Sequence, residues 1–93
     1  MIRSFGDKDT EALYDGRPVR RFQAFRRQAE RRLQIFDSAA SLGDLAALPS
    51  NRFEALAGRR KGSCSIRVNR RWRVCFAWRD DEPHGVEIID THR

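Results

Sequence analysis

The apolar residues of this 93-residue chain change their spacing once, and the change limits the folds that the chain can adopt. In the first half, six apolar residues recur every three or four positions, which is the period of one helix face. They are Phe22, Phe25, Ala29, Leu33, Phe36 and Ala40. In the second half, residues 64–68 and 72–78 are apolar at every second position, as in strands with one buried face. The chain is therefore predicted to pack helices on a sheet, which is an α+β fold.

Shorter elements are predicted from local signals around these two regions. Pro18 suits the first turn of the long helix. The other expected elements are a strand at 2–5, a helix at 8–15 capped by Asp7 or Asp9, a helix at 41–48 ended by Pro49, a strand at 53–57, a polar turn at 80–85 and a last strand at 86–90. The expected architecture is a single domain, residues 1–93, with an N-terminal strand and two to three helices packed on a mainly antiparallel sheet.

The alternation in the two strand segments determines which side chains share a face. If the even-numbered residues of both segments face the helices, Val68 must lie opposite Trp72 across a three-residue loop, residues 69–71. Arg67 then lies opposite Arg73. Both arginines are therefore expected on the outer face of the sheet.

The cysteines and the N-terminus indicate the cellular compartment. Cys64 and Cys75 fall on opposite faces of the predicted sheet, so we expect two reduced thiols and no disulfide. No run of 18 apolar residues exists, and residues 1–5 lack the apolar stretch of a signal peptide. We expect a cytoplasmic protein without a membrane segment.

The charge of the chain is high and unevenly distributed. The net charge is +6, and 17 of the 19 cationic residues are arginines. Residues 52–79 contain nine cations and one anion, Glu54, a net charge of +8. Because arginine binds phosphate bidentately and stacks on bases, this segment favours a nucleic-acid partner. A solvated basic face or a docking surface for an acidic protein remains an alternative.

Several kinds of reaction centre have no counterpart in the sequence. The six glycines are dispersed and form no phosphate-binding loop. The two histidines and two cysteines lack the spacing of a zinc site, and no carboxylate pair is placed for a divalent metal. An enzyme with this sequence is therefore expected to work without a metal or a cofactor.

RNA cleavage is a metal-free reaction that fits the outer face of the predicted sheet. Arg67 and Arg73 project there, the basic loop 59–61 borders it, and residues 90–92 leave the last strand beside it. A base removes the proton of the 2′-hydroxyl, whose oxygen attacks the adjacent phosphate. Arginine stabilises the added charge, and an acid protonates the leaving 5′-oxygen. Histidine is the side chain that ordinarily changes charge near neutral pH, so His92 suits either role. Composition alone favours a frayed tail with an idle histidine.

Seven segments match one family pattern in order and spacing. They are residues 1–5, 51–56, 58, 62, 65–69, 72–78 and 86–92. With them the chain resembles, over its whole length, the HigB toxins of bacterial type II toxin–antitoxin systems. These toxins belong to the RelE/ParE superfamily and include proteins related to plasmid maintenance system killer proteins.

The resemblance implies a RelE/ParE-like microbial RNase fold and an mRNA interferase. Such a toxin cuts mRNA codons in the A site of the 70S ribosome by metal-free attack of the 2′-hydroxyl, and so inhibits translation. The resemblance also implies a HigA-like helix-turn-helix antitoxin, which neutralises the toxin in a toxin–antitoxin heterotetramer. It implies no cofactor.

The resemblance and the charge pattern together give the candidate site residues. The expected catalytic residues are Asp90, His92, Arg73, Glu54 and Thr91. The expected RNA-binding residues are Arg59, Arg60, Lys61, Arg67, Asn69, Arg70 and Arg71. Three positions depart from the family pattern: Thr91 stands where tyrosine is usual, Glu54 where some relatives have histidine, and Ala57 where lysine is common.

Three other functions remain open on the sequence. ParE-like relatives share the fold but poison DNA gyrase, and they would cause DNA damage instead of mRNA cleavage. A non-catalytic relative would bind RNA or the ribosome in a salt-dependent manner without cleaving it. A basic domain whose partner is an acidic protein would have no measurable RNA affinity at physiological salt.

Overall fold

The computed structural model describes residues 1–55 and 62–91, which form a helical layer and one sheet. The helices are α1 (Lys8–Tyr14), α2 (Arg26–Ser38), α3 (Leu42–Ala47) and the 3₁₀ helices η1 (Arg20–Phe25) and η2 (Pro49–Asn51). The strands are β1 (Glu54–Ala55), β2 (Ser63–Arg67), β3 (Trp72–Arg79) and β4 (Glu82–Asp90).

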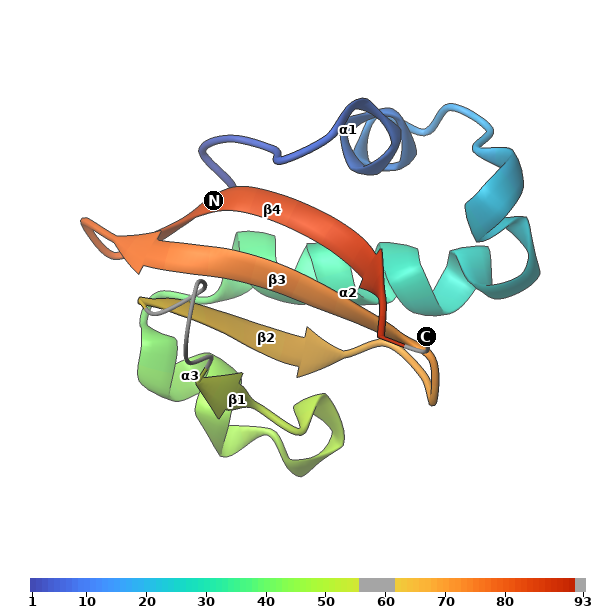
Figure 1. Cartoon of the computed structure of the whole chain (residues 1–93). Coiled ribbons are helices and arrows are strands. Elements are labelled where there is room, and N and C mark those ends of the chain that lie inside the picture. Colours follow the sequence, from blue (N-terminus) through green and yellow to red (C-terminus); the bar gives the residue numbers. More distant parts are fainter. Residues whose placement is uncertain (56–61, 92–93) are drawn as a thin grey trace.

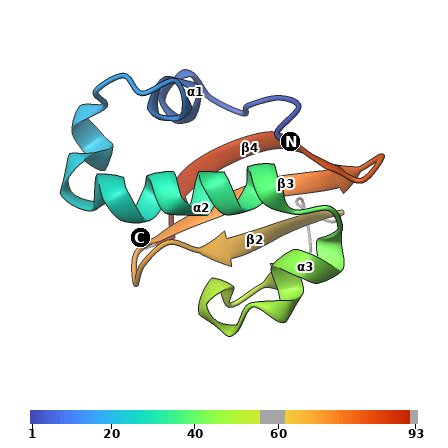
Figure 2. The same ribbon diagram turned by 180° about the vertical axis from the view of Figure 1, so that it is seen from behind.

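The four strands follow chain order across the sheet, and every neighbouring pair is antiparallel. Helix α2 lies across one face of the sheet, and no described helix crosses the other face (Figures 1 and 2). The predicted α+β class is therefore confirmed. None of the helices in the described ranges is both long enough and apolar enough to span a bilayer.

The apolar stripe of the predicted long helix forms the helical side of the core. Phe22, Ala29, Leu33 and Phe36 are almost completely buried. They pack in one cluster with the inner face of the sheet, which contributes Ile66, Val74, Phe76, Val86 and Ile88. Because burying an aliphatic or aromatic side chain stabilises a protein by about 1.5–3 kcal/mol, this contact between layers dominates the stability of the fold.

The long helix is interrupted at Phe25, whose backbone is not helical (φ −129°, ψ 25°). Phe22 and Phe25 lie in η1, and both rings contact Trp72, with centroid distances of 5.7 and 5.0 Å. A 3₁₀ turn places residues three apart on the same side, which lets both rings reach one partner. Ala40 is exposed beyond the end of α2, so its predicted place in the stripe was wrong. The chain there is extended because Ser41 is already the N-cap of α3.

Both short helices begin at capping side chains. Asp7 Oδ1 accepts the backbone N–H of Thr10 at 2.6 Å, at the start of α1. Ser41 and Asp44 form a capping box at the start of α3. Thr10 also joins α1 to the sheet, because its Oγ1 accepts the N–H of Ile88 at 3.0 Å. The helices predicted at 8–15 and 41–48 are therefore confirmed to within one residue at each end.

The β2–β3 hairpin has the predicted register. Arg67 lies opposite Arg73, and the hairpin closes across residues 69–71. The even-numbered side chains of both strands pack against the helices. Cys64 faces the core and Cys75 the other side of the sheet, and the two thiols form no disulfide with each other, as predicted.

The N-terminal residues do not form the predicted strand. Residues 2–5 make a single parallel bridge, between Phe5 and Val86. The N–H of Arg3 bonds the carbonyl of Pro83, whereas the bonds of the next residues go to Val86. Between these two points the pairing of β3 with β4 shifts register, and Gly85 adopts a left-handed backbone (φ 60°), as in a β-bulge. The bulge interrupts the edge of β4, so a regular ladder cannot continue along it.

Two further predicted boundaries are corrected. The polar turn expected at 80–85 is limited to Asp80 and Asp81, both with left-handed backbones (φ 53° and 62°). Such two-residue turns match the twist of a hairpin, so β4 begins at Glu82 and not at residue 86. The strand expected at 53–57 consists of Glu54–Ala55, and residues 56–57 lie outside the described ranges.

Candidate functional site

The face of the sheet opposite α2 carries an open depression beside the β2–β3 turn. The end of β4 lies at the same end of the sheet (Figure 1). The depression has a volume of about 600 Å³. Its lining residues are Arg52, Arg67, Asn69, Arg70, Arg73 and Thr91. Four of these six residues are arginines and none is acidic, so the depression, called the arginine depression below, attracts polyanions.

Arg73 is held in place by β2 and by the residue that follows η2. Its Nε donates to Ser65 Oγ at 2.8 Å, and its Nη2 donates to the carbonyl oxygen of Arg52 at 2.5 Å. Arg52 is the C-cap of η2 and has a left-handed backbone (φ 44°, ψ 56°). The side chain of Arg73 is only 17% exposed. Within the described ranges no residue accepts a hydrogen bond from Nη1, which leaves that nitrogen for a ligand.

Arg67 and Arg70 add positive charge without local neutralisation. Arg67 is directly opposite Arg73 across the hairpin, and like charges in that position repel. Neither Arg67 nor Arg70 has a hydrogen-bonding or ion-pair partner for its side chain in the part of the chain that the structure describes. A phosphate group between these guanidinium groups relieves the repulsion and accepts paired hydrogen bonds.

Asn69 shapes the loop from which Arg70 projects. Its Oδ1 accepts the backbone N–H groups of Arg71 and Trp72, both at 2.9 Å. This is an Asx turn, in which the side chain replaces a backbone acceptor. The carboxamide oxygen of Asn69 is therefore engaged within the loop, although the side chain lines the arginine depression.

Arg71, Asp90 and Thr91 tie the end of β4 to this loop. Asp90 Oδ2 accepts from Nε and Nη2 of Arg71 at 2.8 and 2.7 Å. The N–H and the Oγ1 of Thr91 both donate to the carbonyl oxygen of Arg71 at 2.7 Å. The hydrogen bond that Arg71 donates to Asp90, together with the charge of that carboxylate, raises the pKa of Arg71 above its ordinary value. Thr91 thus lines the arginine depression, whereas the carboxylate of Asp90 is engaged with Arg71 beside it.

Glu54 lies at the margin of the site. Its Oε2 is 3.6 Å from Nη2 of Arg73, and its side chain is 63% exposed. Residue 54 pairs with Ser65 in the β1–β2 ladder, which places its carboxylate beside the anchored guanidinium. Within residues 1–55 and 62–91, no three His, Cys, Asp or Glu side chains gather as metal ligands.

The structure brings most of the predicted residues together. Arg67, Asn69, Arg70, Arg73 and Thr91 line one depression, with Arg71, Asp90 and Glu54 around it. The predicted residues Arg59, Arg60, Lys61 and His92 lie outside the described ranges.

Two residues of the site were not predicted, Arg52 and Ser65. Ser65 shares the odd-numbered face of β2 with Arg67, so strand parity contained the signal for it. Arg52 contributes through its backbone carbonyl as well as its charge. The left-handed turn that places this carbonyl has no signature in the sequence, because left-handed backbone is uncommon outside glycine and asparagine.

Comparison with known proteins places the chain among toxins. Residues 3–92 match the HigB-like toxin family, described as the RelE-like toxin of type II toxin–antitoxin system HigB. Toxin HigB-1 of Vibrio cholerae serotype O1 (strain ATCC 39315 / El Tor Inaba N16961) is 40% identical over 98 aligned residues, which cover 100% of this chain and 99% of the relative.

The crystal structure of YafQ from E. coli strain BL21(DE3) is similar in fold. The TM-score is 0.56 at 13% identity, with 98% of this chain and 92% of YafQ covered. At this identity the likeness concerns the fold alone, and it agrees with the expected RelE-like arrangement of helices on an antiparallel sheet. The chain therefore belongs to the HigB family, the RelE-like toxins of type II toxin–antitoxin systems.

Proposed function

We propose that this toxin is an endoribonuclease that cuts mRNA codons in the A site of the ribosome. The observation that carries the proposal is the arginine depression. Four arginines converge there without an acidic residue among the lining side chains. One of them, Arg73, is fixed by the hydrogen bonds that it donates to Ser65 and to the carbonyl oxygen of Arg52. A guanidinium group that is already oriented can stabilise the negative charge of a phosphorane transition state.

The proposed reaction uses the RNA's own 2′-hydroxyl as nucleophile. Arg67 and Arg70 bind the phosphates on either side of the cut. A base removes the 2′-hydroxyl proton, the oxygen forms a bond to phosphorus, and the bond from phosphorus to the 5′-oxygen breaks. The leaving oxygen takes a proton from an acid. The products are a 2′,3′-cyclic phosphate and a 5′-hydroxyl, and no metal is consumed or required by this scheme.

The proposed roles of Arg73, Glu54, Asp90 and Thr91 follow from their positions, and that of His92 from its place in the sequence. Arg73 stabilises the phosphorane through its remaining N–H groups. Glu54 is the candidate base, because its exposed carboxylate lies 3.6 Å from Arg73. His92 follows Thr91 directly in the chain and is the candidate acid. Asp90 and Thr91 hold the end of β4 against the hairpin through Arg71.

Ribosomal RNA and mRNA supply the polyanion that the charge pattern requires. The proposed RNA-binding set includes the predicted basic loop, Arg59, Arg60 and Lys61. Binding through many phosphate contacts is expected to weaken steeply with salt. A ribosome-dependent role also places the protein in the cytoplasm, with residues 1–93 acting as one domain.

A toxin of a type II system has an antitoxin partner. For this chain we propose a HigA-like helix-turn-helix antitoxin and a toxin–antitoxin heterotetramer. The net charge of +6, carried mainly by arginines, favours an acidic partner.

Cleavage on programmed 70S ribosomes tests the proposal. Purified toxin is given a short mRNA, and a second mRNA that carries a 2′-O-methyl group on the nucleotide before the cut. We expect ribosome-dependent cleavage of the first mRNA with a 2′,3′-cyclic phosphate end, and no cleavage of the second. Equal cleavage of both would contradict the 2′-hydroxyl mechanism. Intact mRNA with broken DNA in growing cells would assign the toxin to gyrase.

A further inference from the structure

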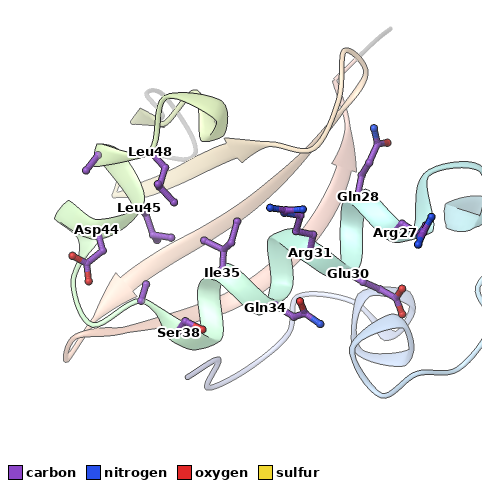
Figure 3. A pocket seen from close by; sticks show the side chains of 12 residues that line it. Arg27, Gln28, Glu30, Arg31, Gln34, Ile35, Ser38, Asp44, Leu45 and Leu48 are labelled. Carbon is purple, nitrogen blue, oxygen red and sulfur yellow. The ribbon is translucent and has the colours of Figure 1, made fainter.

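A groove lies between α2 and α3 (Figure 3). It shares no lining residue with the arginine depression. Its volume of about 1070 Å³ exceeds that of the arginine depression, about 600 Å³. One side of the groove is formed by residues spaced four apart along α2, which therefore lie on one face of the helix. They are Arg27, Arg31, Ile35 and, just after the helix, Ala39. The opposite side is α3 and the residue after it, with Leu45, Ala47 and Leu48.

The floor of the groove is apolar and partly open to solvent. Leu45 is fully buried and Ile35 half-buried, but Leu48 is 43% exposed. Among the described residues, Leu48 is one of only three large hydrophobic side chains with such exposure. An apolar partner side chain placed over Leu48 and Ile35 removes this surface from water, which is favourable.

Two arginines, Arg27 and Arg31, and two acidic residues, Glu30 and Asp44, line the groove, and the arginines give its α2 side positive charge. Its acidic side chains are engaged locally: Glu30 lies 3.3 Å from Nε of Arg26, and Asp44 Oδ2 accepts the N–H groups of Ala40 and Ser41. Figure 3 shows Glu30 pointing to the side of α2 opposite that from which Ile35 projects.

Arg27 and Arg31 supply that charge. Both are exposed, and in the part of the chain that the structure describes neither has an acceptor for its guanidinium. Burial lowers the pKa of neighbouring Arg32, and repulsion from Arg31 lowers it further. Positive potential therefore remains along the α2 side of the groove.

We infer that this groove binds an acidic amphipathic segment of the partner antitoxin. Its aliphatic side chains cover Leu45 and Leu48, and its carboxylates pair with Arg27 and Arg31. A polypeptide can present both carboxylates for the arginines and aliphatic side chains for the apolar floor. RNA can present phosphates to the arginines, but it has no aliphatic group for the floor. The inference rests on the antitoxin partnership of the family and is independent of ribonuclease activity.

The test compares toxin variants in binding to the antitoxin encoded with this toxin, by isothermal titration calorimetry at two salt concentrations. One variant is Leu48→Glu, which places a carboxylate on an exposed position. The second is the double variant Arg27→Glu/Arg31→Glu. The control is Arg20→Glu/Arg79→Glu, which makes the same charge change at exposed arginines outside both sites.

We expect each groove variant to weaken binding about tenfold or more, as for central interface residues, and the control to change it by less than about threefold. The double variant is also expected to reduce the salt dependence. Unchanged affinity of both groove variants would overturn the inference. So would a dimer of free toxin that Leu48→Glu converts to a monomer, because a second copy would then occupy the groove.

A parallel cleavage assay separates this inference from the proposed activity. Groove variants that keep wild-type mRNA cleavage and lose the antitoxin support both. If the wild type cleaves no mRNA and the groove variants still lose the antitoxin, the groove assignment stands and the ribonuclease proposal fails.

Discussion

Arg73 Nε donates to Ser65 Oγ at 2.8 Å, across two neighbouring strands on the face of the sheet that α2 leaves open. Ser65 is 1% exposed, so its hydroxyl serves the guanidinium and not solvent. The carbonyl of Arg52 holds Nη2 of the same side chain. Two elements distant in the sequence thus fix one arginine beside three others.

Removing the Ser65 hydroxyl is expected to slow cleavage without weakening RNA binding. In Ser65→Ala, Arg73 keeps its charge but loses one anchor, so kcat falls about tenfold, equivalent to about 1.4 kcal/mol, while KM stays within about twofold. Single-turnover cleavage on programmed ribosomes measures both. Ser63→Ala, on the same strand and face, is the matched control.

A double-mutant comparison shows whether Ser65 acts through Arg73. If it does, Ser65→Ala has no further effect on the rate when Arg73 is already alanine. An additional tenfold loss in that background would show that Ser65 acts by another route, such as general destabilisation of the sheet.

The Arg71–Asp90 pair is expected to act by holding the end of β4 against the hairpin. Arg71→Ala and Asp90→Asn disrupt the same ion pair, in which Nη2 and Nε of Arg71 contact Asp90 Oδ2 at 2.7 and 2.8 Å. Both variants should therefore lose activity to a similar extent, about tenfold, and the double variant should lose no more than either. Cleavage rates of the three proteins decide this. A much larger loss in Asp90→Asn alone would indicate that the carboxylate takes part in the chemistry itself.

Thr10 provides a test of the fold that does not involve the site. Its Oγ1 accepts the N–H of Ile88 at 3.0 Å in a fully buried position that joins α1 to β4. Thr10→Val keeps the shape but leaves that N–H without an acceptor, so the free energy of unfolding should fall by about 1–3 kcal/mol. Urea titration measures the change, and Thr10→Ser, which keeps the hydroxyl, should lose less. Equal loss in both variants would point to packing instead of the hydrogen bond.

Cys64 makes the stability of the protein sensitive to alkaline pH. Burial raises the pKa of its thiol above the ordinary value of 9.0. The folded protein therefore holds the thiol proton more tightly than the unfolded chain, and this contribution is present below pH 9.0 and lost as pH rises through the folded-state pKa. The free energy of unfolding should decrease more steeply above pH 9 in the wild type than in Cys64→Val. Parallel curves for the two proteins would contradict the assignment.

Much of this arrangement could be predicted because strand parity is a strong local rule. A shift of one residue would move Val74 and Phe76 from the core to solvent, so the hydrophobic pattern alone places Arg67 opposite Arg73. The stripe from Phe22 to Phe36 likewise predicts the helical face that covers the sheet.

The remaining features depend on tertiary context. The break at Phe25 follows from the position of Trp72, which is far along the chain. The pairing of Arg71 with Asp90 requires β4 to end beside the hairpin loop. The bulge at Gly85 and the left-handed turn at Arg52 are backbone features that residue periodicity does not encode. Sequence reasoning therefore predicted most of the side chains that line the arginine depression but not the groups that orient them.

Primer extension on an abundant mRNA after induced expression in bacteria tests the central claim, that the arginine depression is the site of mRNA cleavage. The proteins compared are the wild type, Arg73→Ala, His92→Ala and the control Arg79→Ala, an exposed arginine on the same strand outside the depression. We predict cuts within translated codons for the wild type and the control, and a loss of about a hundredfold for Arg73→Ala and His92→Ala at equal protein levels. Undiminished cutting by Arg73→Ala, or growth arrest by the wild type with intact mRNA, would contradict the account.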